Sequence, residues 1–98
     1  MIKITRNPTT PGEILKEEFL APLGMTQGKS ALHLNCDVKV INRIINGHSS
    51  VTAEMAIKLA AAFNTTSEFW LSAQKAVDFY KASKKIDKLP KSLLLKTA

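Results

Sequence analysis

The chain has 98 residues, 45% of them hydrophobic, and a single cysteine, which predicts one small globular domain without an internal disulfide framework. No apolar run approaches the roughly 18 to 20 residues of a membrane span, and the N-terminus lacks a signal-peptide core, so we expect a cytoplasmic protein without membrane contact. The net charge of +6 favours an anionic partner.

The positive charge is concentrated toward the C-terminus. Residues 1–50 carry six basic and four acidic groups, whereas residues 75–98 carry seven lysines and two aspartates. We expect residues 1–82 to form the folded domain and residues 83–98 to form a basic tail that stays flexible unless contact with a partner orders it.

A first helix is expected directly after an extended segment over residues 1–9. Thr10 is a good N-cap, Pro11 suits the first helical position, and Glu13 completes a capping box. Pro22 is expected to limit this helix, because the residue before a proline is disfavoured in helical conformation, and Gly24 completes the stop.

Two short helices joined by a tight corner are predicted next. Thr26 caps a helix over residues 27–34, and Asn35 tolerates the left-handed conformation that a helix C-terminus often needs. Asp37 then caps a second helix, which ends at Asn46 and Gly47; the glycine is expected to have a positive φ.

The second of these helices has two different faces. Its apolar stripe consists of Ile41, Ile44 and Ile45, and its opposite face presents Lys39, Asn42, Arg43 and Asn46. These are side chains that can reach base edges and phosphates, although an ordinary amphipathic helix with a solvated face would show the same pattern.

Two further helices complete the chain. Thr52 caps a helix over residues 53–63 that is apolar almost all round and is therefore expected in the middle of a bundle. Asn64 ends it, and residues 65–68 form another capping box that opens a fifth helix rich in aromatic residues.

The motifs resemble those of a known family. The segment VINRIINGHSSVTAEMAIKLAAAFNTTSEFWLSAQ looks like the helix-turn-helix family of phage-repressor type (XRE-type). With the opening TPGEILKEEFLAPLGMTQ, it is similar to the HigA-type antitoxins, also called virulence-associated protein I, over roughly residues 8–80. The resemblance implies an all-α, five-helix repressor-like domain. It also implies a DNA-binding protein that represses its own operon and neutralises a ribonuclease toxin of RelE-like fold.

The chain departs from this family at the start of the predicted recognition helix. Family members commonly have glycine and valine where Asn35 and Cys36 stand, and Ser or Thr at position 37. Two valines, Val38 and Val40, replace polar residues, which suggests contacts with thymine methyl groups rather than hydrogen bonds.

Seven residues are predicted to contact DNA, and each could instead be an ordinary solvated side chain. Arg43 and Lys39 are expected at base edges, and Gln27 at a phosphate. The full set is Gln27, Val38, Lys39, Asn42, Arg43, Asn46 and His48.

One recognition helix covers few base pairs, so we expect a homodimer on a palindromic operator. The candidate interface residues are Phe69, Val77, Phe79 and Tyr80. A stand-alone repressor and a protein-interaction module that binds no DNA remain alternatives. We expect no enzyme, because the sequence shows neither paired carboxylates in a plausible pocket nor a nucleophile with a base. No cofactor is expected, and His33 and His48 are too few for a metal site.

Overall fold

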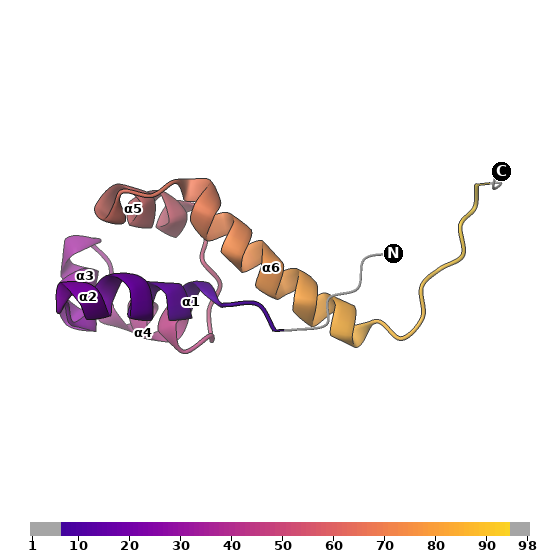
Figure 1. The fold of residues 1–98 in the computed structure, drawn as a ribbon, viewed down its shortest axis with the longest axis horizontal. Helices are drawn as coiled ribbons and strands as arrows, with labels where there is room; N and C mark the ends of the chain where they lie inside the picture. Colours follow the sequence, from indigo (N-terminus) through magenta and orange to yellow (C-terminus); the bar gives the residue numbers. More distant parts are fainter. Residues whose placement is uncertain (1–6, 95–98) are drawn as a thin grey trace.

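The computed structural model describes residues 7–94, and within that range all regular structure is helical (Figure 1). Five helices follow one another, the first being continuous through three segments. The bounds are α1 Pro11–Ile14, η1 Leu15–Leu20 and α2 Ala21–Leu23 for the first helix, then α3 Gln27–His33, α4 Val38–Ile45, α5 Ala53–Phe63 and α6 Ser67–Lys85. The expected all-α, five-helix fold is confirmed.

The first helix begins as predicted but ends later. The capping box is present: the Thr10 N–H donates to Glu13 Oε1 (2.9 Å), and the Glu13 N–H donates to Thr10 Oγ1 (3.1 Å). The prediction that Pro22 limits the helix is wrong, because the chain stays helical to Leu23. The predicted stop at Gly24 is confirmed, since this residue caps the helix with a φ of 62°. A proline in an α-helix clashes with the carbonyl four residues back. Here η1 is π-helical, and this wider turn accommodates the ring.

The corner between α3 and α4 forms as predicted. Thr26 Oγ1 accepts from the Lys29 N–H (3.1 Å), and Asp37 Oδ1 accepts from the Lys39 N–H (2.8 Å), so both N-caps are confirmed. Asn35 has a φ of 55° and turns the chain between the helices. Because each helix end is satisfied locally, α4 leaves the corner in a defined direction.

The core holds α4 by its isoleucine stripe. Ile41 and Ile44 are buried and Ile45 is half-buried, as the sequence predicted. The first turn of α1 lies against the C-terminal end of α4, where a Cβ on Gly12 would overlap the Ile44 carbonyl oxygen and lie 2.8 Å from Ile45 Cα. With its apolar side on the core, α4 leaves Lys39, Asn42 and Arg43 exposed.

Helix α5 has the predicted bounds but not the predicted surroundings. Met55, Ala56 and Leu59 are buried, whereas Ile57 is 62% exposed and Ala61 is also exposed. The expectation that neighbours surround α5 is therefore wrong. Its principal helix partner is α6, and five helices are too few to cover a helix on every side.

Helix α6 begins one residue later than expected. The predicted capping box at residues 65–68 is wrong, because the cap is Thr66, whose hydroxyl accepts from the Phe69 N–H (3.1 Å). Thr65 instead accepts from Trp70 Nε1 (2.8 Å). Because the Thr65 hydroxyl accepts from the buried indole, the neighbouring Thr66 acts as the N-cap of α6.

Helix α6 extends past residue 82, where the folded domain was expected to end. It continues to Lys85 and projects from the bundle (Figure 1). Residues 86–94 follow it without helix and are exposed. The N-terminal residues 1–6 and the last part of the basic tail, residues 95–98, lie outside the described residues. Within residues 7–94, the helices are too short or too polar to cross a bilayer.

Candidate nucleic-acid interface

The structure brings all seven predicted DNA-contacting residues to the start of α3, to α4 and to the loop after α4. Five of them line one shallow hollow: Gln27, Val38, Lys39, Asn42 and Arg43. Asn46 donates a hydrogen bond to the Asn42 side chain, and the His48 carbonyl accepts one from Arg43, so both residues belong to the same surface. Val38 is 44% exposed, which leaves its methyl groups available to an apolar contact.

Three amide side chains form a chain of hydrogen bonds across the two helices. Asn42 Nδ2 donates to Gln27 Oε1 (3.1 Å), and Asn46 Nδ2 donates to Asn42 Oδ1 (3.2 Å). Among residues 7–94 the Gln27 side chain donates no hydrogen bond, so both of its N–H groups are left for an outside acceptor, and Asn42 keeps one N–H and one lone pair. The first turn of α3 thereby orients the middle of α4.

Arg43 is held by the loop that follows α4. Its Nε donates to Ser49 Oγ (2.9 Å), and its Nη2 donates to the His48 carbonyl (3.2 Å). The predicted contact residue His48 thus supports Arg43 through its backbone, while its imidazole is exposed.

The surface carries the cations Lys39 and Arg43, beside the exposed carboxylate of Asp37 that caps α4. Among residues 7–94 one ion pair is present, between Lys58 and Glu54 (3.6 Å), and it lies on α5 rather than α4. Lys39 and Arg43 are both exposed without a carboxylate partner in that part of the chain. Such a surface attracts a polyanion, since no internal charge must be displaced first.

The remaining candidates for chemistry have structural surroundings. Cys36 is half-buried against the core, and burial raises the pKa of its thiol; Lys58 lowers that pKa and Asp37 raises it, both less strongly. A thiol with a raised pKa is a poor nucleophile. Within residues 7–94, His, Cys, Asp and Glu do not gather into a group of three that could hold a metal ion.

The predicted interface residues are divided between the core and the surface of α6. Phe69 and Phe79 are 41% and 47% exposed, and Tyr80 is half-buried beneath the Lys84 ammonium, 5.3 Å from the ring centroid. Val77 is only 7% exposed and lies on the inner side of α6. The available apolar face of α6 therefore consists of Phe69, Phe79 and part of Tyr80.

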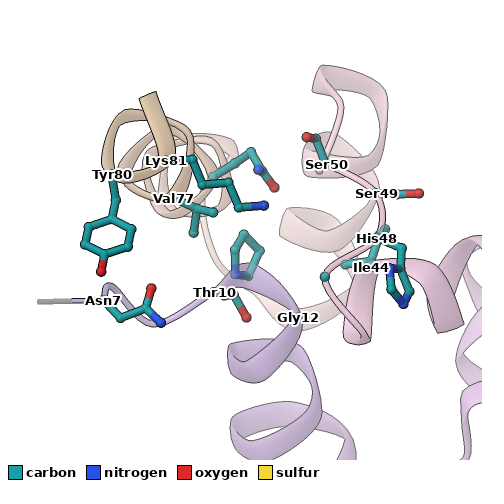
Figure 2. Close-up of a pocket in the computed structure, with 13 residues that line it drawn as sticks. Asn7, Thr10, Gly12, Ile44, His48, Ser49, Ser50, Val77, Tyr80 and Lys81 are labelled. Carbon is teal, nitrogen blue, oxygen red and sulfur yellow. The ribbon is translucent and has the colours of Figure 1, made fainter. Parts of the chain in front are cut away.

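Sequence reasoning missed two features of this region. One is a hollow of about 420 Å³ between the start of α1, the loop after α4 and the inner side of α6 (Figure 2). The other is Ser49 as the hydrogen-bond partner of Arg43. The positive φ expected at Gly47 could have indicated the contact of Ser49 with Arg43, because it turns the chain back toward the end of α4.

An exposed polar helix, reached through a tight corner from a shorter helix and seated on the core by its apolar side, defines a helix-turn-helix domain. Residues 15–71 match the helix-turn-helix family. The chain is 46% identical to an HTH-type transcriptional regulator of Haemophilus influenzae, over 79% of this chain and 72% of that protein. It is 45% identical to antitoxin HigA-1 of Vibrio cholerae, over 82% of this chain and 75% of that protein.

Among solved structures, the Pseudomonas aeruginosa antitoxin HigA, determined with the higBA promoter, superposes with a TM-score of 0.82. The two sequences are 30% identical, and the match covers 90% of this chain and 100% of that antitoxin. The chain belongs to the helix-turn-helix family of phage-repressor type and, within it, to the HigA-type antitoxins.

Proposed function

We propose that this protein is a sequence-specific DNA-binding repressor of its own operon and the antitoxin of a toxin–antitoxin pair. The observation that carries the proposal is the face of α4, which is exposed, positively charged and already ordered by hydrogen bonds to α3 and to the loop. A relative solved on promoter DNA supports it. Family membership implies a RelE-like ribonuclease toxin as the protein partner.

The residues divide by the chemistry that each can perform. Arg43 and Lys39 carry donors for base edges in the major groove, and Val38 offers methyl groups to thymine. Gln27 lies at the start of α3, where its free N–H groups and the helix N-terminus suit a phosphate. Asn46 and His48, at the end of α4 and in the loop, are assigned to the sugar-phosphate backbone.

The test is binding to a duplex from the region upstream of its own reading frame, compared with a scrambled duplex of the same composition. We expect the promoter duplex to bind more tightly by about a thousandfold or more at physiological salt. Gln27→Ala should weaken both duplexes to a similar degree, because phosphate contacts carry no sequence information. Equal affinity of the unmodified protein for both duplexes would instead favour an interaction module that reads no DNA.

We further propose that the protein is a homodimer in which the exposed face of α6 meets its copy. Phe79→Glu places a charge on that face and should convert a dimer into a monomer at tens of micromolar, as measured by sedimentation equilibrium. Ile57→Glu is the control, since Ile57 is also an exposed apolar residue but lies on α5. A dimer that survives Phe79→Glu but is lost in Ile57→Glu would assign the interface to α5.

A further inference from the structure

The side chain of Arg43 is positioned by its own loop before any DNA is bound. Two hydrogen bonds run from the guanidinium to the loop, from Nε to Ser49 Oγ (2.9 Å) and from Nη2 to the His48 carbonyl (3.2 Å). Two more run in the opposite direction, from the His48 N–H (2.8 Å) and the Ser49 N–H (3.3 Å) to the Arg43 carbonyl. Residue 43 and residues 48–49 therefore form a closed hydrogen-bonded unit.

The local sequence explains why the loop reaches Arg43. Gly47 has a φ of 75°, a conformation that side chains with a Cβ rarely adopt, and it reverses the chain directly after α4. The next two N–H groups then meet a carbonyl that the end of the helix leaves free. This turn sets Ser49 on the α4 side of the loop, whereas Ser50 points the other way (Figure 2).

The geometry decides which edge of the guanidinium stays available. A guanidinium has five N–H groups, and it can form paired hydrogen bonds either side-on, through Nε and Nη2, or end-on, through Nη1 and Nη2. The loop occupies the side-on pair completely. Within residues 7–94 Nη1 has no hydrogen-bond partner, so the end-on pair is left for an outside acceptor. Arg43 lines the same hollow as Val38 and Lys39.

We propose that Ser49 is a positioning residue for base recognition: it holds Arg43 so that the end-on edge of the guanidinium meets the O6 and N7 acceptors of a guanine. The proposal rests on the proposed function. In the major groove only guanine presents two acceptors side by side, so an arginine restricted to one planar edge discriminates this base better than a freely rotating one. Ordering the side chain beforehand also removes rotamer entropy that binding would otherwise have to overcome.

The experiment measures sequence preference rather than affinity alone. The full chain and the variants Arg43→Ala, Ser49→Ala, Ser49→Thr and Ser50→Ala are each equilibrated with a promoter duplex and with all its single-base-pair variants. For the unmodified protein we expect one guanine in each half-site whose replacement by another base weakens binding. In Arg43→Ala, replacing that same guanine should no longer change the affinity. Ser49→Ala should reduce discrimination at that guanine by about two- to tenfold, the usual effect of one hydrogen bond, and leave every other position unchanged.

Ser49→Thr keeps a hydroxyl and should restore the discrimination. Ser50→Ala should behave like the unmodified protein, because within residues 7–94 the Ser50 hydroxyl forms no hydrogen bond. Equal losses at all positions or on random DNA for Ser49→Ala would overturn the proposal, since they would indicate a phosphate contact or a disturbed fold. Unchanged discrimination would overturn it too. Failure of the unmodified protein to prefer its promoter would be a different result, because it refutes the proposed function itself.

Discussion

Replacing Arg43 with alanine is expected to remove about 2 to 6 kcal/mol of binding free energy on the operator, because each protomer of the proposed dimer would lose one paired base contact of about 1 to 3 kcal/mol. Affinity for random duplex should change little, since on random DNA the side chain meets no matching base. Competition binding against both duplexes, at one fixed salt concentration, measures the two losses separately.

Arg43→Lys is the matched control for charge. Lysine keeps the positive charge but has no planar fork, and it cannot reproduce both the bonds to the loop and the pair to a base. We expect it to retain affinity for random DNA while losing most of the operator preference. Similar losses on operator and random DNA for Arg43→Ala would show that this residue contacts phosphate and that the reading face lies elsewhere on α4.

Replacing Trp70 with alanine is expected to lower the free energy of unfolding by about 3 to 5 kcal/mol, a large part of the total of about 5 to 15 kcal/mol for a small domain. The indole is fully buried and packs against Phe19 (ring centroids 5.5 Å apart) and Phe69 (5.2 Å), and its Nε1 donates to Thr65. It joins the first helix to α6, so its removal opens a cavity at the junction of both.

Urea unfolding at a fixed protein concentration, followed by far-ultraviolet circular dichroism, measures this loss. Fluorescence is unsuitable because Trp70 is the single tryptophan. Trp70→Phe keeps an aromatic ring but removes the donor to Thr65, so a smaller loss is expected. A loss below about 1 kcal/mol for Trp70→Ala would mean that the surrounding rings close the cavity.

Local signals in the sequence predicted much of the fold because their effects extend over only a few residues. An N-cap needs a side-chain oxygen and an N–H two or three residues away, so Thr10, Thr26, Asp37 and Thr52 could be recognised without knowing the rest of the chain. The isoleucine spacing in α4 likewise separated a buried side from a polar one. The seven candidate contact residues follow from that separation, and their contacts with DNA remain predictions.

The errors arose where two local rules competed or where distant groups supplied the answer. Pro22 should have ended a helix, but a π-helical turn before it removes the clash. Thr65 and Thr66 are both suitable caps, and the indole of Trp70 determines which one is free to serve. The composition of α5 predicted complete burial, yet Ile57 is exposed because the helices within residues 7–94 leave that side of α5 uncovered.

The sequence by itself therefore determined the helices, the corner and the polar face of α4, since each depends on contacts between residues close in the chain. Only the tertiary structure decided how that face is ordered. The bond from Asn42 to Gln27 joins residues 15 positions apart, and the bond from Arg43 to Ser49 needs the loop to return across the end of α4. Such contacts depend on the angle between helices and on the path of a loop, which packing sets and hydrophobic periodicity does not encode.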